Sequence, residues 1–378
     1  MPISLKHLLN GQMSYMRNNG FNVIMVSSYG KELEDVIRNE KCKHIVINLT
    51  RKITILKDLY ATYKLYMLLR KEKPHIVHTH TPKAGIVGML ASFLAGIPIR
   101  LHTVAGLPLV EAKGFKRLIL NLTEKLTYRF STMVYSNSFA LKDFILKNKF
   151  TYRNKLKVIG NGSSNGIDTS YFNPKIFSDD DKEILKNSLG VKKNDFVYIF
   201  VGRIVSAKGI NELIKAFNKL SKFNDNIKLL LVGTMEDDLD PLDLATKKII
   251  NLNPKIILVG YQNDVRPYFS ISDCLVFPSY REGFPNVVMQ SGAMGLPSIV
   301  SNINGCNEII EDNVNGIIIP AKDTDAVYNS MKKIYCDKNL YNDTKSKSRN
   351  AIKKKYERKI FWKQLLNEYN DLLKKNNL

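Results

Sequence analysis

Short apolar runs alternate with segments of helical periodicity along the first part of the chain. Each run has the length of a buried strand and is bounded by polar or turn-forming residues. The runs lie at 21–28, 44–49, 75–80, 99–104 and 132–138. Between them, residues 56–71 and 114–130 carry apolar residues at helical spacing. Strands that alternate with helices in this way predict a parallel sheet covered by helices.

A second series with the same alternation begins after about residue 190. Its strand-like runs lie at 195–202, 226–233, 255–260, 273–279, 297–301 and 315–320. The two series are joined by residues 157–174, where Gly, Asn and Ser gather and the chain can change direction. We therefore predict two Rossmann-like, doubly wound α/β domains, over residues 1–165 and 166–342.

The last segment, residues 343–378, is basic and helical in pattern. An apolar stripe runs along it, formed by Phe361, Trp362, Leu365, Leu366 and Tyr369. A stripe of this kind usually packs against the rest of a protein, so we treat this segment as a third part of the chain.

The beginning of the chain departs from the pattern. Residues 5–18 look helical and the first convincing strand is 21–28, although a domain of this type opens with a strand. Without the usual first strand and its glycine-rich turn, a central position of the first sheet is empty or filled from elsewhere. Because a strand of roughly five or six residues is costly to lose from a sheet centre, we expect an upstream start codon.

Composition limits the class of protein. A chain of 378 residues is longer than one hydrophobic core usually reaches, and 44% hydrophobic with 24% charged residues is ordinary globular usage. The four cysteines are widely spaced without a C-x-x-C pair, which indicates neither a disulfide framework nor a zinc site and fits a reducing cytoplasm. No apolar stretch approaches the roughly 20 residues of a spanning helix, and no signal-peptide core is present.

The net charge of +22 is unevenly distributed. Residues 1–150 hold 23 Lys and Arg against 9 Asp and Glu, and residues 341–378 hold 11 against 4, whereas the stretch between them is almost neutral. Basic surfaces attract nucleic acid, anionic lipid headgroups or phosphorylated substrates, and charge alone does not separate these from an ordinary solvated surface. Nucleic-acid binding lacks any RNP, zinc-finger or helix-turn-helix signature.

The first candidate site is VGRIVSAKG, residues 201–209. It follows an apolar strand and precedes a helical pattern, so Arg203 and Lys208 lie on a loop at the carboxyl end of a strand, where doubly wound sheets bind ligands. A guanidinium, an ammonium and the amides of a helix start can together hold a pyrophosphate. The alternative is two solvated cations on a surface loop.

The second candidate site is SYREGFPNVVMQSGAMGLPSIVS, residues 279–301. Pro285 suits the first turn of a helix that stops near Gly295, so Glu282 stands just before a helix start and Gln290 lies two turns on. Gly283 lets the backbone approach a ligand closely. The alternative is an acid that complements the helix dipole and a glutamine that faces solvent.

Three histidines and a lysine mark the first domain. His102 is expected at the end of a strand, and a lone histidine there is more often structural than catalytic. His78 and His80 share one side of a strand but lack a third ligand, which argues against a metal site. Lys83, just after that strand, faces either an acceptor phosphate or solvent.

The motifs become specific in combination. GRIVSAKG, followed some 75 residues later by REGFPNVVMQSGAMGLPSIVS and NGCNEII, resembles the retaining, metal-independent glycosyltransferases of family four, which have the GT-B fold. VHTHTPKAGIVG, LHTVAG and GNGSSNGID extend the resemblance over nearly the whole chain. LHTVAG and GNGSSNGID resemble the branch that builds bacterial capsule, exopolysaccharide and O-antigen repeat units on a lipid pyrophosphate carrier.

The resemblance implies roles for individual residues. Arg203 and Lys208 would grip the donor diphosphate, Glu282 would lie against the donor sugar, and His102 would approach the transferred sugar. The second acid of the E-x7-E motif, which normally binds the nucleotide ribose, is Gln290 here; its amide oxygen can still accept one such bond. The positions implied in donor binding are Gly202, Arg203, Lys208, Gly283, Phe284, Pro285, Asn286 and Gln290, and Lys83 is the implied acceptor contact.

The implied activity is transfer of a sugar, with retention of configuration, from a UDP-linked donor of the N-acetylhexosamine type. The acceptor would be linked to a polyprenyl pyrophosphate, and neither a cofactor nor a metal is expected. In the GT-B fold the last helix crosses back to the first domain, so both basic segments would share a side that can lie on the anionic inner face of the cell membrane. The alternative is a catalytically impaired GT-B protein that binds sugar nucleotides or membranes, with Gln290 and the missing strand as its evidence.

Overall fold

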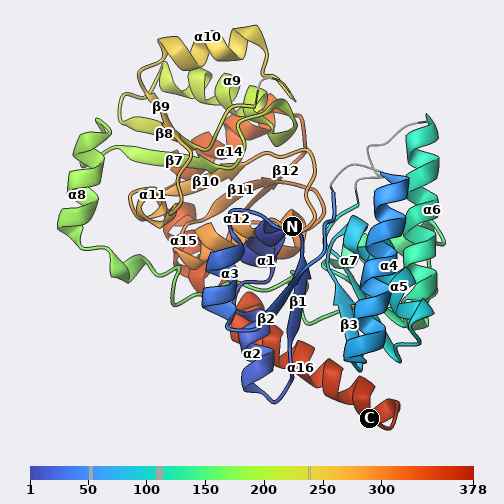
Figure 1. The fold of residues 1–378 in the computed structure, drawn as a ribbon. Coiled ribbons are helices and arrows are strands. Elements are labelled where there is room, and N and C mark those ends of the chain that lie inside the picture. Colours follow the sequence, from blue (N-terminus) through green and yellow to red (C-terminus); the bar gives the residue numbers. More distant parts are fainter. Residues whose placement is uncertain (51–53, 108–113, 237, 239) are drawn as a thin grey trace. The chain divides into compact units, whose positions relative to one another are not determined.

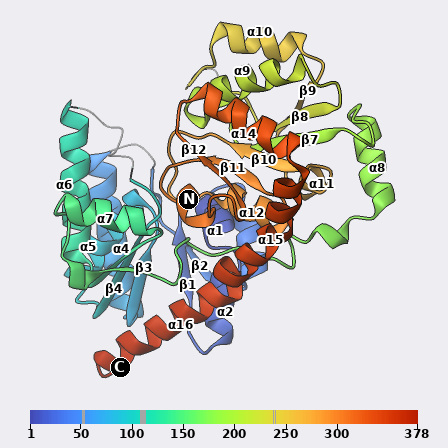
Figure 2. The same cartoon turned by 180° about the vertical axis from the view of Figure 1, so that it is seen from behind.

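The computed structural model describes residues 1–50, 54–107, 114–236, 238 and 240–378. The chain folds as two compact units. Unit 1 contains residues 1–166 together with 358–378, and unit 2 contains residues 167–357. Figures 1 and 2 show their elements from opposite sides.

Unit 2 contains one sheet of six parallel strands in the order β12-β11-β10-β7-β8-β9. Its strands are β7 (Phe196–Val201), β8 (Ile227–Val232), β9 (Ile256–Gly260), β10 (Cys274–Phe277), β11 (Ser298–Ser301) and β12 (Gly316–Ile319). Its helices are η3 (Pro174–Ile176), α8 (Asp179–Ser188), η4 (Ser206–Lys208), α9 (Ile210–Ser221), α10 (Leu244–Leu252), α11 (Arg266–Ser270), α12 (Asn286–Ala293), α13 (Cys306–Ile309), α14 (Thr324–Cys336) and α15 (Lys338–Tyr356). Every strand predicted in this part of the sequence is present, and the doubly wound fold is confirmed.

The central strands of unit 2 are buried on both faces. In β7, Val197 to Phe200 have no exposed surface, and the same holds for Cys274 to Val276 in β10. Helices α9 and α14 pack against one another, while α12 packs against α15, so each face of the sheet is covered. Burial on both faces explains why these strands read as continuous apolar runs rather than as alternating patterns.

The described residues of unit 1 form six strands in two separate parallel sheets. One sheet has the order β3-β4-β5-β6 and the other consists of β1 and β2. The strands are β1 (Ile24–Ser27), β2 (Lys43–Val46), β3 (Ile76–Thr79), β4 (Ile99–Val104), β5 (Met133–Ser136) and β6 (Leu156–Val158). The helices are α1 (Pro2–Leu8), α2 (Gln12–Asn18), α3 (Leu33–Glu40), α4 (Ile55–Glu72), α5 (Pro82–Leu94), α6 (Gly114–Phe130), α7 (Phe139–Lys147), η2 (Arg153–Lys155) and α16 (Arg358–Lys375). Strand β6 falls where the sequence predicts only the start of a linker.

The split of the unit 1 sheet confirms the prediction that its first strand is missing. β1 pairs with β2, and β3 pairs with β4, but β1 and β3 do not pair with each other. Both sheets nevertheless share a core, because Val26 of β1 and Val77 of β3 pack in one cluster with Leu65 of α4 and Val87 of α5. The two sheets are therefore held together by covering helices instead of by a central strand.

The prediction of a single terminal helix over residues 343–378 is wrong, because residues 338–375 form two helices. α15 belongs to unit 2 and α16 to unit 1, and the break lies at Glu357, whose ψ of 129° is not helical. Glu357 pairs with Ile167, and its carboxylate accepts a hydrogen bond from the Thr169 hydroxyl. In α16 the predicted apolar stripe packs on the sheet of unit 1, where Leu365 joins Leu101 in one core cluster.

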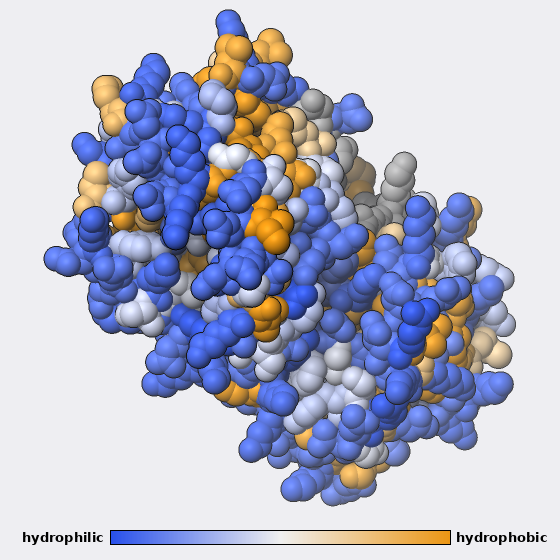
Figure 3. All heavy atoms as spheres, turned by 90° about the vertical axis from the view of Figure 1, so that its left-hand side faces the viewer, coloured by the Kyte–Doolittle hydropathy of each residue, from blue (hydrophilic) through white to orange (hydrophobic). Residues whose placement is uncertain are grey.

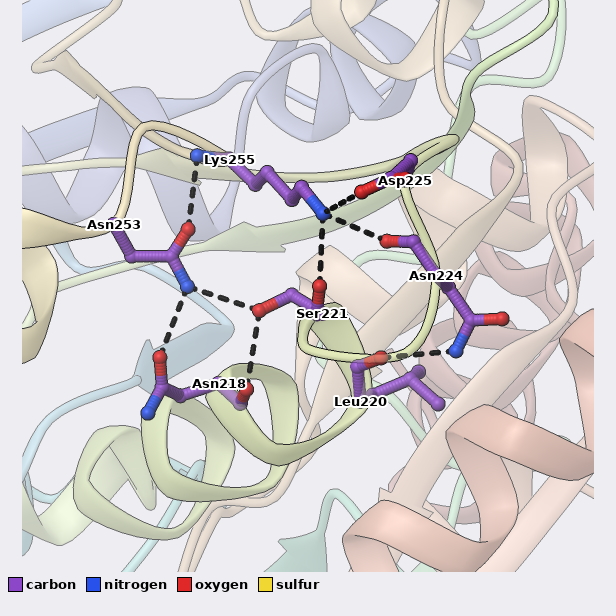
Figure 4. Close-up of polar contacts among 7 residues, drawn as sticks. All are labelled: Asn218, Leu220, Ser221, Asn224, Asp225, Asn253 and Lys255. Atoms are coloured by element: carbon purple, nitrogen blue, oxygen red, sulfur yellow. Dashed lines mark hydrogen bonds and ion pairs between the residues drawn. The ribbon is translucent and has the colours of Figure 1, made fainter.

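A groove of about 540 Å³ lies between α9 and α10. Its volume is that of a ligand site, but its polar side chains are hydrogen-bonded to other groups of the protein. Figure 4 shows the Lys255 ammonium donating to the carbonyls of Ser221 and Asn224 and to the carboxylate of Asp225, at 2.8, 2.9 and 2.9 Å. Asn253 donates to the Ser221 hydroxyl at 3.0 Å. The Lys255 ammonium therefore donates to carbonyl groups at the end of α9, which have no hydrogen-bond partner within the helix.

The surface shown in Figure 3 is mainly hydrophilic, with hydrophobic side chains in scattered groups, as is usual for a folded protein. Within the described part of the chain, no helix combines the length and the apolar character that crossing a bilayer demands.

We expect Lys255→Met to destabilise the protein by about 2 kcal/mol, because three bonds to a charged donor are lost and the end of α9 loses its partner. Urea denaturation followed by circular dichroism measures the difference. The matched control is Lys248→Met, an exposed lysine on the same groove, which we expect to change stability by less than about 0.5 kcal/mol. Equal effects of the two substitutions would contradict this role of Lys255.

Candidate functional site

The candidate site of unit 2 lies where the strand order reverses. Strands β7 and β10 are neighbours, but β8 follows β7 on one side and β11 follows β10 on the other. In open α/β sheets, ligands bind in the crevice outside the carboxyl ends of two such strands. The loop after β7 carries Arg203 and Lys208, and the loop after β10 carries Glu282.

The two loops are in direct backbone contact. The Tyr280 amide donates to the Ala207 carbonyl at 3.0 Å, and a Cβ atom on Gly209 would lie only 2.1 Å from the Pro278 carbonyl oxygen. Gly209 has a φ of 71°, in the left-handed region that favours glycine, and forms the start of α9. The glycine at the end of the GRIVSAKG motif is therefore required by the approach of the second loop.

Lys208 and Glu282 form an ion pair across these loops. The Ser279 hydroxyl also donates to the Glu282 carboxylate, at 2.9 Å, and the Lys208 ammonium lies 5.4 Å from the centre of the Phe277 ring. Both charged side chains are largely buried, and a buried charge without a partner is unfavourable, so each stabilises the other. The contact brings together two residues that the sequence analysis assigned to two separate candidate sites.

Arg203 lies on the same loop but forms a different pair. Its guanidinium contacts the Glu236 carboxylate at 2.9 Å, and half of the Arg203 side chain remains exposed. Glu236 follows β8, so the loops after three neighbouring strands contribute charged groups to one edge of the sheet. Sequence reasoning missed Glu236, although its place just after a buried strand is the same signal that identified Arg203.

The loop before α12 is held by a second residue that the sequence analysis missed. The Asn304 side chain donates to the carbonyls of Glu282 and Gly283, at 3.2 and 2.7 Å. The next residue, Gly305, begins α13, and a Cβ atom there would lie 2.6 Å from the Gly283 carbonyl oxygen. The NGCNEII motif thus fixes the backbone on which Glu282 is carried.

The remaining predicted donor-binding positions differ in what they can offer a ligand. Pro285 precedes α12 as its cap instead of occupying the first turn, so the helix begins one residue later than predicted. Phe284 is buried, with its ring 5.5 Å from the Tyr356 ring, so its side chain is part of the core of unit 2. Asn286 is exposed, and Gln290 is partly buried in α12. Gly202 has a φ of 148°, and its backbone lies close to Gly233 in the loop after β8.

In unit 1, the prediction that His102 stands at the end of a strand is wrong. β4 continues to Val104, and the His102 ring is 1% exposed. The ring packs beneath α5, since a Cβ atom on Gly85 would lie 2.6 Å from its Cε1, and its Nδ1 bonds to the Thr79 hydroxyl at 2.8 Å. Burial lowers the pKa of His102 to about 3, so the ring is neutral at physiological pH. Its role at the transferred sugar stays a prediction.

His78 and His80 stack with ring centres 4.1 Å apart, on the side of β3 that faces α16. Both ring nitrogens of His78 are engaged, with the hydroxyls of Tyr369 at 2.6 Å and Thr103 at 2.7 Å. Burial lowers the pKa of His80 to about 4. A cavity beside these rings has room for about one water molecule, and the hydroxyl partners of His78 make this pair part of the core of the sheet.

Lys83 lies in the first turn of α5 and forms an ion pair with Asp58 of α4. Both side chains are mostly buried, so Lys83 is held at the carboxyl edge of the unit 1 sheet rather than extended into solvent. The predicted contact with an acceptor phosphate is untested, but the cation is fixed at the edge where such a contact would occur.

Glu124 of α6 is a buried acid that the sequence analysis did not single out. It is 4% exposed, and its Oε2 has no hydrogen-bond partner among the described residues. Burial raises the pKa of Glu124 to about 7, against the opposing effect of the neighbouring Tyr128 hydroxyl. The carboxyl group is therefore largely neutral below pH 7, unlike an ordinary glutamate.

Two family models match this sequence. Residues 181–351 match the model of glycosyl transferases group 1, and residues 5–138 match the model of glycosyl transferase 4-like proteins. The first falls entirely within unit 2 and the second entirely within unit 1.

Two relatives cover most of the chain. The capsular polysaccharide biosynthesis glycosyltransferase CapM of Staphylococcus aureus is 33% identical over 98% of this chain and 95% of its own length. An Escherichia coli UDP-Gal:alpha-D-GlcNAc-diphosphoundecaprenol alpha-1,3-galactosyltransferase is 31% identical over 89% of this chain and 88% of its own length. Among solved structures, Anabaena HepE in complex with UDP and glucose has the same fold, with a TM-score of 0.80 at 19% identity, covering 96% of this chain and 94% of that one.

We expect Glu124→Gln to gain stability over the wild type as the pH rises. The unfolded chain ionises Glu124 near pH 4.5 and the folded chain near pH 7, so the wild type binds more protons when folded and loses stability as pH rises between these values. The glutamine side chain of the variant cannot ionise, so the stability difference should grow by about 2 kcal/mol from roughly pH 5 to pH 7.5. Urea denaturation at a series of pH values measures it.

Lys125→Gln on the exposed side of the same helix is the control and should leave the pH dependence unchanged. If the wild type and Glu124→Gln had parallel stability curves over this range, Glu124 would have an ordinary pKa and the burial argument would fail.

Proposed function

The chain belongs to the family-four glycosyltransferases of bacterial surface-polysaccharide biosynthesis, and we propose that it moves a sugar from a UDP-linked donor to a lipid-pyrophosphate-linked acceptor with retention of configuration. The observation that carries the donor part of the proposal is the Lys208–Glu282 contact at the switch point of the unit 2 sheet. The printed name of the Escherichia coli relative, which includes UDP-Gal and a diphosphoundecaprenol, supports both substrate classes.

The donor diphosphate is expected to lie between Lys208, Arg203 and the amides at the start of α12. Departure of the sugar leaves negative charge on the phosphate, and fixed cations that face that charge stabilise it where it develops. Because two cationic side chains supply the positive charge, the proposed reaction uses no metal ion. Because half of the Arg203 side chain is exposed, Arg203 can exchange Glu236 for the diphosphate at low cost, since exposed ion pairs contribute little free energy.

Glu282 then has two consecutive partners in this proposal. Without the donor it neutralises Lys208, and with the donor bound Lys208 turns to the phosphate and the carboxylate becomes available to sugar hydroxyls. The Ser279 hydroxyl and the Asn304 side chain keep the loop in place during this exchange. The acceptor hydroxyl attacks from the face that the nucleotide leaves and gives its proton to the departing phosphate, so no protein nucleophile is needed.

The acceptor is assigned to unit 1 and to the inner face of the cell membrane. Residues 1–150 carry a large excess of Lys and Arg, and α16, with five Lys and Arg against two Asp and Glu, is part of the same unit. A positive surface raises the local concentration of anionic lipids and of a pyrophosphate-linked acceptor. Lys83, held at the carboxyl edge of the sheet, is the proposed contact for an acceptor phosphate.

A second candidate function is that of a catalytically impaired protein that binds a sugar nucleotide without transferring the sugar. The enclosure of His102 and the presence of Gln290 at the second motif position favour it. Incubation with a panel of UDP-sugars and a lipid-pyrophosphate acceptor separates the two functions. Acceptor-dependent release of UDP supports the transferase, and tight UDP binding without release supports the binding protein.

We expect Lys208→Met to lower kcat/KM for UDP release by about 100-fold or more, because one preorganised charge at the developing phosphate anion is removed. Lys215→Met is the matched control: Lys215 lies on α9 in an exposed ion pair with Asp243, and its loss should change kcat/KM less than about 2-fold. Equal activity of Lys208→Met and the wild type would remove Lys208 from the donor site.

We expect Gln290→Glu to tighten UDP binding, by up to about 10-fold, since a carboxylate accepts a hydrogen bond from a ribose hydroxyl more strongly than an amide oxygen does. Isothermal titration calorimetry with UDP measures the change. Uridine, which lacks the phosphates, should show the same relative gain if the contact is to the ribose. Unchanged or weaker binding of both ligands would place residue 290 away from the nucleoside.

A further inference from the structure

Tyr280 lies in the loop after β10, two residues before Glu282, and its side chain reaches helix α9. Its hydroxyl donates to the Glu212 carboxylate and lies 2.8 Å from each of the two carboxylate oxygens. Burial and the neighbouring carboxylate raise the pKa of the Tyr280 hydroxyl, so the hydroxyl stays protonated and remains a donor at physiological pH. Glu212 belongs to the first turn of α9, where the helix dipole favours a negative charge. The Tyr280 side chain therefore ties the loop that carries Glu282 to the start of α9.

The ring of Tyr280 is also held from its face. The Lys322 ammonium lies over the ring, 4.8 Å from its centre, a distance at which a cation is attracted to an aromatic face. Lys322 follows β12 and directly precedes Asp323, whose side chain caps α14. Groups at the starts of two helices, α9 and α14, thus fix both the hydroxyl and the ring of this side chain.

The start of α9 is itself joined to the other loops of the site. The Asn211 side chain donates to the Ser206 hydroxyl at 3.1 Å and accepts a hydrogen bond from the Asp243 amide, also at 3.1 Å. Ser206 lies in the loop after β7, and Asp243 ends the loop after β8 as the cap of α10. These contacts connect two of the ligand loops to α9, and the bond between Tyr280 and Glu212 connects the third.

The core of unit 2 does not depend on the Tyr280 side chain. Tyr280 is partly exposed and lies outside the core cluster of the unit, whereas Tyr198 of β7 is fully buried within that cluster. The Tyr198 hydroxyl also makes a hydrogen bond, to the Met331 carbonyl of α14 at 2.8 Å. One tyrosine of the unit therefore holds a ligand loop and the other holds the core, so the two contributions can be measured separately.

We propose that Tyr280 is a positioning residue, which holds Glu282 in the place that sugar transfer requires. Only Arg281 separates Tyr280 from Glu282, so a displacement of the Tyr280 backbone is passed on to the carboxylate. A misplacement of about 1 Å can slow a reaction by about 100-fold, and groups on loops need supporting contacts more than groups on helices or strands do. The proposal rests on the proposed function for the role of Glu282, but not for the order of the loop.

The test compares Tyr280→Phe with the wild type in acceptor-dependent release of UDP, with the donor that is active in the panel of UDP-sugars. The substitution removes the hydroxyl and keeps the ring, so the bond to Glu212 is lost while the contact with Lys322 remains. We expect kcat to fall by about 10-fold or more, because Glu282 acts on the sugar in the transition state. The Kd for UDP, measured by isothermal titration calorimetry, should change by less than about 2-fold, because UDP lacks the transferred sugar.

Two substitutions of Glu212 show whether the bond itself is responsible. Glu212→Gln keeps an oxygen that accepts from the Tyr280 hydroxyl, so kcat should stay within about 3-fold of the wild type. Glu212→Leu removes the acceptor and should lower kcat as Tyr280→Phe does. The double variant of Tyr280→Phe and Glu212→Leu should be about as slow as each single variant, since both break the same bond. Losses that multiply in the double variant would mean that the two residues act separately and would overturn the proposal.

The matched control is Tyr198→Phe, which removes a hydrogen bond from the core of the same unit. We expect it to lower thermal stability at least as much as Tyr280→Phe, and to leave kcat within about 2-fold of the wild type. If Tyr198→Phe lowered kcat as much as Tyr280→Phe does, the loss of activity would follow from stability, and the positioning role would fail.

Hydrogen–deuterium exchange separates this inference from the proposed function. The amides of residues 280–284 should exchange faster in Tyr280→Phe than in the wild type, whereas those of the sheet should not change. Equal exchange in the two proteins overturns the positioning role, even if the wild type releases UDP, and so does faster exchange with an unchanged kcat. Faster exchange confined to this loop supports the holding of the loop even if no UDP-sugar is turned over, and in that case the proposed function alone fails.

Discussion

The close approach of the loops after β7 and β10 is the constraint on which the candidate site depends. Parallel pairing of the two strands brings the loop ends together, and the bond from the Tyr280 amide to the Ala207 carbonyl fixes their distance. The contact is possible only with glycine at 209, since any side chain there would meet the Pro278 carbonyl. The result is that Lys208 and Glu282, 74 residues apart, share one ion pair at the edge where doubly wound sheets bind ligands.

The pairing of each cation with a carboxylate makes an empty anion site tolerable. A partly buried ammonium without a partner would cost several kcal/mol, and so would an unpaired carboxylate. Pairing of Glu282 with Lys208 offsets these costs, whereas the half-exposed Arg203 depends much less on Glu236. In the proposed reaction a diphosphate competes with the two carboxylates, so the net gain on binding would be smaller than the contacts alone suggest. The same competition would release Glu282 towards the sugar and so couple donor binding to the arrangement of the site.

Much of the fold and part of the site could be predicted because both follow from local chemistry. Buried parallel strands appear in the sequence as continuous apolar runs. Polar residues flanked by glycine directly after such runs indicate ligand-binding loops, and this pattern identified Arg203, Lys208 and Glu282 as candidates. Features that depend on packing between residues far apart in the sequence could not be predicted in this way. The enclosure of His102 depends on how closely α5 approaches β4 at Gly85, and the break at Glu357 depends on pairing with Ile167. Neither contact leaves a signal in the neighbouring residues.

Both units bury titratable groups, either as ion pairs or as neutral side chains. In unit 2, Lys208 and Glu282 form an ion pair, whereas burial raises the pKa of the Cys274 thiol. In unit 1 burial lowers the pKa of His78, His80 and His102 and raises that of Glu124, so these interior groups are largely neutral below pH 7. The net positive charge of unit 1 therefore arises from the Lys and Arg residues at its surface, because the titratable groups of its interior are neutral or paired.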